Sequence, residues 1–432
     1  MIPRKKFYLL LVLAVSSSLS NTAFSSHNTN RYFPFLERSD NYLYRKKSYA
    51  HASLFYATAS TAFKTGGGNA GMFELSGKYD LKDVFRSLDE FKKFTMPKTF
   101  STELNSFTDK TEFKAEGKIK TRGLTLQYDQ DLKWHNLSIG AWLPIVLMNT
   151  TGRFNPADKT LSFNEKVNLN ELRRTIHENL DLRENNWDKG GCGDLDTYLR
   201  WNYYAEHKLL MRSFNIDIIA GCLFPTGIKT DPRHFSSVPA MGNGHWGMYV
   251  DLAPEFELKQ NLKFGFIFGT MYQFKKTKTR RIPMYNEPAI FSPLVGKASI
   301  DPGMTFKLSP YLILENLTDG LHFQARYTYL RHNTDTWKDV RTDAEQSNYP
   351  SYLTRKPTAD ITQEKIGANI ANKKYLSKWR AHYITLQCLY NSKDALHNLP
   401  FDPNIYVMYD LPINGRGIGK THQISLGVEL HF

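Results

Sequence analysis

Apolar and polar residues alternate along a series of segments in this chain. In the last segment, THQISLGVELHF, the residues Ile424, Leu426, Val428, Leu430 and Phe432 alternate with polar or small residues. Such alternation puts one set of side chains on each face of a β-strand. Similar segments predict thirteen strands, near 51–63, 70–79, 117–128, 135–147, 194–206, 214–225, 246–258, 262–274, 298–312, 320–331, 378–390, 404–411 and 421–432.

The connections between these strands separate a membrane barrel from a soluble sandwich, which would also alternate. Every second connection is short, and the others are long enough to be uncommon inside a compact soluble domain. Outer-membrane barrels combine short periplasmic turns with long external loops. The short connections are 66–69, 130–134, 259–261 and 315–319, and the long ones are 80–116, 148–193, 226–245, 275–297 and 332–377.

The predicted fold is therefore all-β: a transmembrane antiparallel barrel with long external loops, and a soluble secreted β-protein is the alternative. Single-chain bacterial barrels have an even number of strands, so one of the thirteen assignments is wrong. The first segment, a strand hidden in 32–44, or the weak segment 404–411 could account for it. We expect 12 or 14 strands, with 12 preferred. Helical spacing near 81–91 and 168–182 predicts loop helices over the barrel mouth.

The amino terminus has the layout of a secretory signal peptide. Arg4, Lys5 and Lys6 precede an apolar run, and a serine-rich stretch ends at Ser25. We therefore assign residues 1–25 to the signal, 26–49 to an extension or lumen plug, and 50–432 to the barrel. The protein is expected in a bacterial outer membrane.

Composition supports this location. Aromatic residues make up 14% of the chain, and tyrosine and tryptophan collect at membrane interfaces. The net charge of +14 suits anionic lipopolysaccharide or anionic solutes, and no nucleic-acid motif is present. The basic run 275–281 could contact lipopolysaccharide phosphates or be solvated. Cys192 and Cys222 could pair, although buried thiols are the preferred interpretation.

The chain resembles two groups of known proteins. Its terminal strand is similar to those of outer-membrane proteins that end in an aromatic residue, which implies that Phe432 is read by the barrel-assembly machinery. The stretches GCGDLDTYLRWNYYAEHKLLMRSFNIDIIAGCLFPTG and GHWGMYVDLAPEFEL resemble the outer-membrane transporters associated with meta-pathway phenol degradation, distant relatives of long-chain fatty-acid channels. The matching positions are Gly191, Gly193, Asp194, Gly221, Pro225, Thr226 and Gly227.

That resemblance implies passive uptake of small solutes, aromatic or lipophilic ones among them. A barrel that only anchors the loops 149–190 and 332–377 for binding or adhesion is the alternative. No catalytic, metal or cofactor constellation stands out, so an outer-membrane lipid-modifying enzyme is disfavoured. Charge facing lipid is costly, so the strand charges should face the lumen and line a translocation path: Asp196, Arg200, Asp251, Glu255, Glu257, Arg326 and Glu429.

Overall fold

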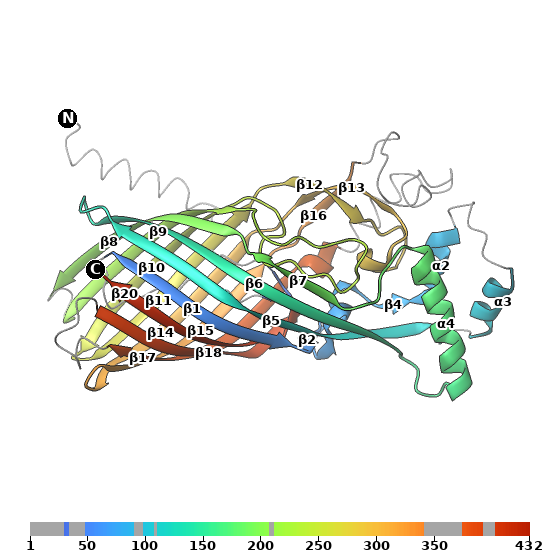
Figure 1. The fold of residues 1–432 in the computed structure, drawn as a ribbon, viewed down its shortest axis with the longest axis horizontal. Coiled ribbons are helices and arrows are strands. Elements are labelled where there is room, and N and C mark those ends of the chain that lie inside the picture. The colour runs from blue at the N-terminus through green and yellow to red at the C-terminus, as the bar shows by residue number, and fades with distance from the viewer. Residues whose placement is uncertain are drawn as a thin grey trace.

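The chain forms a closed antiparallel β-barrel of 12 strands (Figure 1). The computed structural model describes residues 30–33, 48–89, 98–107, 110–206, 211–340, 374–391 and 402–432. Strand β1 pairs with both β20 and β5, and β5 pairs with β6, which closes the wall. The staves are β1 (Tyr49–Ala59), β5 (Glu112–Asp131), β6 (Leu137–Pro156), β8 (Leu195–Glu206), β9 (Ser213–Phe224), β10 (Gly247–Lys259), β11 (Leu262–Gln273), β14 (Thr305–Thr318), β15 (Leu321–His332), β17 (Trp379–Asn391), β18 (Asp402–Arg416) and β20 (His422–His431).

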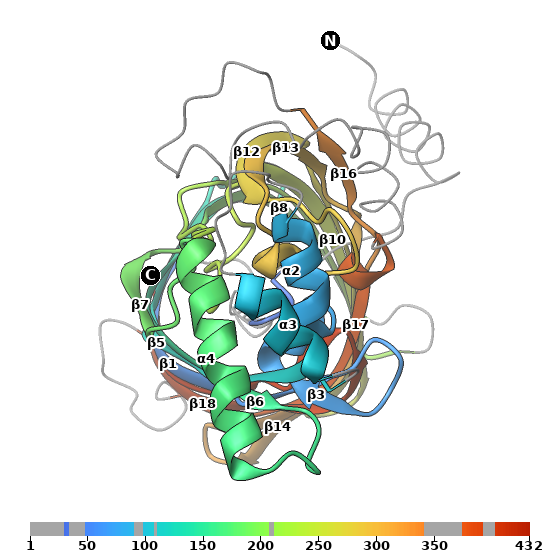
Figure 2. The same ribbon diagram turned by 90° about the vertical axis from the view of Figure 1, so that its right-hand side faces the viewer.

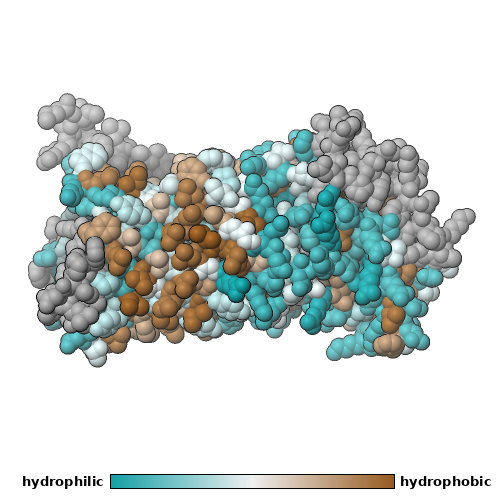
Figure 3. All heavy atoms as spheres, viewed as in Figure 1, coloured by the Kyte–Doolittle hydropathy of each residue, from teal (hydrophilic) through white to brown (hydrophobic). Residues whose placement is uncertain are grey.

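The outer wall carries an apolar belt, as the alternation predicts. On β20, Ile424 and Leu426 are each 49% exposed, whereas Ser425 and Glu429 are buried on the inner face. Figure 3 shows hydrophobic side chains gathered in a band on the barrel wall, beside a hydrophilic surface at the long-loop end. A contiguous apolar band of this kind on a closed barrel faces lipid. The barrel is thus of the transmembrane class. No helix in the described part of the chain is long and apolar enough to cross a membrane.

One predicted strand is not a stave, and this accounts for the odd count. Residues 70–79 form the short β3 (Asn69–Gly71), the 3-10 helix η1 (Met72–Ser76) and the start of β4 (Tyr79–Asp80). β3 pairs with β2 (Thr61–Phe63), which pairs with β19 (Ile418–Gly419), in a small separate sheet at the long-loop end. The predicted count of 12 is confirmed, and the weak segment 404–411 lies within the genuine stave β18.

The prediction that 66–69 is a turn at the short-turn end is wrong. Gly67 and Gly68 have φ values of 100° and 82°, which suit a tight hairpin, and that hairpin joins β2 to β3. Its length and glycine content are the same as those of a barrel turn, so sequence could not separate them. The other three predicted short turns do join staves: β5 to β6, β10 to β11 and β14 to β15.

A cap of helices and short strands stands over the long-loop end, and Figure 2 shows the helices across the mouth. Ser162 accepts a hydrogen bond from the backbone of Glu165, whose carboxylate accepts one in return, so a capping box starts α4. The predicted loop helices are thus present. The cap elements are α2 (Leu81–Asp89), α3 (Lys98–Ser106), α4 (Phe163–Asn179), β7 (Trp187–Cys192), β12 (Lys276–Arg281), η2 (Ala289–Phe291), β13 (Val295–Asp301), β16 (Thr336–Asp339) and η3 (Lys374–Ser377).

Part of the amino-terminal extension lies inside the mouth. The backbone of Gly419 donates to the carbonyl of Arg31 (2.9 Å), and the buried Phe33 ring lies 6.3 Å from that of Phe55. The predicted signal peptide lies outside the described residues, as does most of 26–49. Cys192 is an exposed free thiol and Cys222 a half-buried one, so neither the pairing nor full burial of both is found.

Removing Phe432 should lower the yield of folded barrel. Its amide donates to the Ser48 carbonyl (3.0 Å), and its ring, 53% exposed, stacks 6.2 Å from that of Tyr128. An aromatic pair contributes about 1 kcal/mol, so the folding equilibrium should shift about fivefold towards the unfolded form, and the heat-modifiable form on gels should be lost at a lower temperature. Phe432→Tyr is the control, since it keeps the ring. Normal assembly of the truncated chain would contradict the prediction.

Candidate functional site

The barrel interior holds the charged residues predicted from the strand pattern. Six of the seven are buried on the inner face: Asp196, Arg200, Asp251, Glu255, Arg326 and Glu429. Glu257 is half-buried at the short-turn end, where it accepts from Ser213 (2.8 Å) and pairs with Arg212 (3.2 Å). Whether these residues contact a solute stays a prediction.

Several of these charges are held by neighbouring strands. Tyr249 donates to Asp196 (2.7 Å), and Tyr311 donates to Glu255 (3.0 Å). Arg200 forms a buried ion pair with Asp217 (3.1 Å). Asp217 is not among the predicted lumen charges, although alternation along β9 places it on the inner face. Charge-assisted bonds of this kind are strong in a low-dielectric interior, so the lumen side chains are fixed in position.

Tyrosine rings fill space in the lumen that glycines leave open. Tyr249 lies opposite Gly221 in the β9–β10 register, and a Cβ on that glycine would come within 2.3 Å of the ring. Tyr198 covers Gly140 in the same way at 2.2 Å. Aromatic cover over a glycine on the next strand stabilises curved sheets. The position Gly221 of the family-like stretch is thus explained by packing.

Acidic residues outnumber basic ones inside the described part of the wall. Arg200, Lys307 and Arg326 are the buried bases of the staves. All of these side chains are buried, so the lumen is a packed polar interior. Its net charge is negative. The buried stave acids are Asp129, Asp196, Asp217, Asp251, Glu255, Asp410 and Glu429.

The remaining motif residues converge on one corner at the start of β8. Asp194 accepts hydrogen bonds from the amides of Gly227 and Gly242, both at 2.8 Å. Thr226 donates to the Gly193 carbonyl (2.8 Å) and accepts from the Leu195 amide (3.0 Å). This network fixes the loop 225–246 beneath the mouth. Its role is to hold the shape of the site.

A cavity of about 380 Å³ lies in the mouth, between residues 30–32, the loop 225–246 and the sheet β12–β13–β16. Apolar and aromatic side chains form much of its wall: Tyr32, Phe235, Met241, Ile290, Ile300, Trp337 and Trp379. Polar groups converge on the same space: Asp231, His234, His245, Arg280, Arg281, His332 and Asp335. A mostly apolar wall with a few placed polar groups is the usual form of a small-molecule site.

The polar groups of the cavity have defined partners. His332 contacts Asp335 (2.9 Å) and Thr305 (2.8 Å), and its ring stacks 5.5 Å from that of Trp379. Burial raises the pKa of Asp335, but the hydrogen bond and charge of His332, the Gly303 amide and the charge of Arg31 together outweigh it and lower that pKa. Burial and the nearby Lys278 lower the pKa of His245 to about 4. Asp335 is therefore charged and His245 neutral at pH 7.

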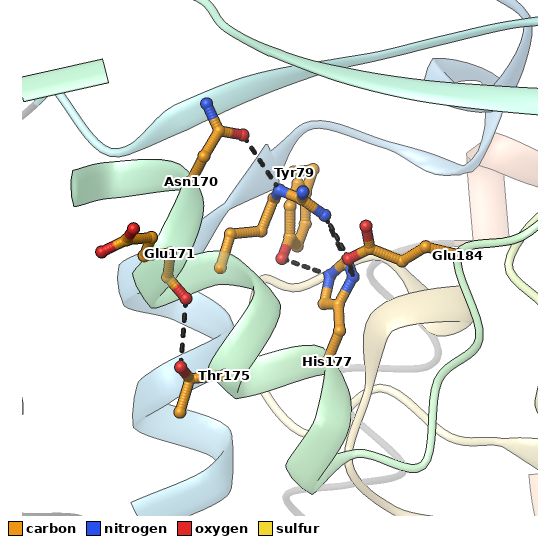
Figure 4. Close-up of polar contacts among 7 residues, drawn as sticks. Tyr79, Asn170, Glu171, Thr175, His177 and Glu184 are labelled. Atoms are coloured by element: carbon orange, nitrogen blue, oxygen red, sulfur yellow. Dashed lines mark hydrogen bonds and ion pairs between the residues drawn. The ribbon is translucent and has the colours of Figure 1, made fainter. Parts of the chain in front are cut away.

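A second buried network lies in the cap (Figure 4). Tyr79 bonds to Nε2 of His177 (2.6 Å), and Nδ1 of His177 bonds to Glu184, which also pairs with Arg173. Tyr79 and His177 are fully buried, and none of these residues lines the cavity. The network joins α4 to β4 and to the segment after the helix. It is structural.

Comparison with known proteins finds similar solved structures. No family model and no curated protein matches the sequence. An outer-membrane channel of Pseudomonas putida F1 is 9% identical with a TM-score of 0.47, over 91% of this chain and 100% of that one. The Pseudomonas putida toluene transporter TodX is 8% identical (TM-score 0.32, 95% and 96% covered), and a Pseudomonas aeruginosa FadL homologue 10% identical (TM-score 0.29, 95% and 99% covered). The first of these structures is described as an outer-membrane channel and the second as a toluene transporter.

Proposed function

We propose that the protein is an outer-membrane channel for the passive uptake of small solutes that carry an apolar or aromatic body. The mouth cavity is the observation that supports this proposal most directly. Its volume of about 380 Å³ lies in the range of small-molecule sites, which run from about 300 to 1,000 Å³. Its aromatic wall suits a flat ring, and the charged groups that share the wall would orient a polar substituent.

The packed lumen below the cavity supports selective passage in place of a wide pore. A 12-stranded barrel has a wider interior than an eight-stranded one, which side chains can just fill. Here tyrosine rings and paired charges occupy that interior. A solute must then displace side chains or move along them. The acidic balance of the lumen would favour water, neutral solutes and cations over anions.

The proposal predicts a small, cation-selective conductance in planar bilayers. Asp251→Asn with Glu255→Gln removes two buried acids from the lumen and should roughly halve the cation preference, because rings of charge set ion selectivity. Glu103→Gln with Glu171→Gln is the matched control, since both residues are exposed in the cap. The control should keep the wild-type selectivity.

Solute uptake completes the test. Trp337→Ala removes an aromatic wall of the cavity and should slow the entry of benzyl alcohol into proteoliposomes while leaving the ion conductance intact. A protein that stays silent in bilayers, and whose deletion leaves uptake unchanged, would favour the anchor alternative, in which the loops 149–190 and 332–377 carry the function.

A further inference from the structure

Three arginines form a row across neighbouring strands on the outer wall. Arg331 of β15 lies opposite Arg380 of β17, which lies opposite Arg416 of β18. The adjacent residues Leu330 and Ala381 are buried on the inner face. Since side chains alternate between faces, the three guanidinium groups stand on the outside.

The row lies at the long-loop edge of the apolar belt. Two residues below it, Tyr329 lies opposite His382, with ring centroids 5.0 Å apart, and Tyr327 bonds to His382 (2.6 Å). Further down the same wall of β17, Leu386 and Tyr390 are 44% and 40% exposed. Aromatic and amphipathic side chains mark the headgroup level of a bilayer. The arginines are therefore level with lipid headgroups.

No acidic side chain neutralises the row within the described part of the chain. None of the three arginines forms an ion pair there, and Nε of Arg380 has no hydrogen-bond partner. Neighbouring strands lie about 4.8 Å apart, and like charges placed directly opposite one another are destabilising. Lys378, exposed just above Arg380, adds a fourth positive charge. A counter-charge from outside the chain would relieve this repulsion.

The basic run that the sequence suggested for lipid contact is arranged differently. Arg281 is buried and donates to backbone carbonyls. Lys278 donates to the Asn243 carbonyl, and burial together with Arg280 and Lys276 lowers its pKa to about 6. Arg280 and Arg281 line the mouth cavity, and Lys278 is bonded to the loop 225–246. They do not form a basic surface at the belt edge.

We infer that Arg331, Arg380 and Arg416 bind the phosphate groups of a phosphorylated glycolipid, lipopolysaccharide, in the leaflet at the long-loop end. Guanidinium groups match phosphate oxygens in a bidentate fork. The row spans two strand spacings, about 10 Å, which accommodates a head carrying more than one phosphate. The acyl chains of the same lipid would lie on the apolar belt below. This binding is independent of solute transport.

The test is retention of lipid A by the full-length purified barrel. Wild-type protein in nanodiscs that contain bis-phosphorylated lipid A should keep bound lipid in native mass spectrometry. The triple variant Arg331→Gln, Arg380→Gln, Arg416→Gln should bind about tenfold less, because each lost arginine–phosphate contact weakens binding. Dephosphorylated lipid A should bind the wild type as weakly as the variant binds the phosphorylated form. Excess inorganic phosphate should compete only weakly, since it lacks the acyl chains.

A second triple variant controls for charge. Lys133→Gln, Lys159→Gln, Lys259→Gln removes the same charge from exposed positions away from the long-loop edge of the belt, and its retention of lipid A should equal that of the wild type. Heat-modifiable migration shows that each variant is folded. Equal retention by the two triple variants, or equal binding of dephosphorylated lipid A, would overturn the inference. Competition by free phosphate at low concentration would assign the row to a soluble anion instead.

Discussion

Replacing Arg281 by glutamine should loosen the cap while leaving the barrel assembled. The guanidinium is 3% exposed and donates to the carbonyls of Pro232 (2.6 Å), Ser292 (2.9 Å) and Leu180 (2.7 Å). These carbonyls belong to the loop 225–246, to the segment after η2, and to the end of α4. One side chain thus ties three loops together at the cavity.

A shorter amide cannot reach all three acceptors, so buried carbonyls would lose their donor. Each buried group left without a partner costs about 1–3 kcal/mol, so local opening of the cap should become easier by about 3–5 kcal/mol. Limited proteolysis and hydrogen exchange of residues 157–186 and 225–246 would report this change. Arg174→Gln, at an exposed position of α4, should leave protection unchanged. Wild-type protection in the Arg281 variant would contradict the prediction.

The staves could be predicted because each satisfies a local rule. A lipid-facing strand must be apolar at every second residue, and β20 meets that requirement with Ile424, Leu426, Val428 and Leu430. The same rule placed Asp251 and Glu255 inside. It failed at 70–79, because Met72, Phe73 and Leu75 are buried in the cap and a short buried helix is also rich in apolar residues.

The cavity could not be predicted in the same way. Its wall combines residues 30–32, 230–245, 280–302, 332–337 and 376–379. These segments come together only when the barrel closes and the loops fold over its end. Alternation carries no information about such long-range contacts. The motif stretch did point to the right region, since Asp194 and Thr226 fix the loop that forms one side of the cavity.

The arginine row shows what register adds to sequence. Arg331, Arg380 and Arg416 are far apart along the chain and belong to no basic run. Only the pairing of β15 with β17 and of β17 with β18 brings them side by side. The charges of the run 275–281 are close together in the sequence, yet Lys278 and Arg281 donate to backbone carbonyls within the fold.

Acidification should open the cap before it affects the barrel. Nδ1 of His177 bonds to Glu184 while its Nε2 bonds to Tyr79, an arrangement that the neutral ring satisfies by donating from Nδ1 and accepting at Nε2. Burial lowers the pKa of His177 from 6.5 to about 4, although the hydrogen bond to Glu184 opposes this. The pKa of Glu184 falls to about 2, because the bonds and charges of His177 and Arg173 outweigh burial, which raises it.

Proton uptake by His177 determines whether acid stabilises or destabilises the closed cap. Between pH 6.5 and pH 4 the opened cap binds a proton at His177 that the closed cap excludes, so the free energy of opening falls as pH falls. The full pKa difference corresponds to about 3 kcal/mol. Ionised Glu184 also stabilises the closed cap. That stabilisation is lost only at lower pH, as the pH falls from about 4.5 towards 2. Protection factors, which correct for the slower intrinsic exchange of amides at low pH, should therefore fall in α4 and in residues 180–186 on acidification from pH 7 to pH 4.5, while those of the staves stay constant.

Two variants separate His177 from a general effect of acid. His177→Gln cannot take up the proton, so its cap should be less protected at pH 7 and should change little on acidification. His135→Gln, at an exposed position in the turn between β5 and β6, should respond to pH as the wild type does. A wild-type cap whose protection factors are constant from pH 7 to 4.5, or a His177→Gln cap that keeps the full response, would show that the acid-sensitive group lies elsewhere. A response confined to wild type and His135→Gln would assign it to the buried His177, since only that ring links α4 to both Tyr79 and Glu184.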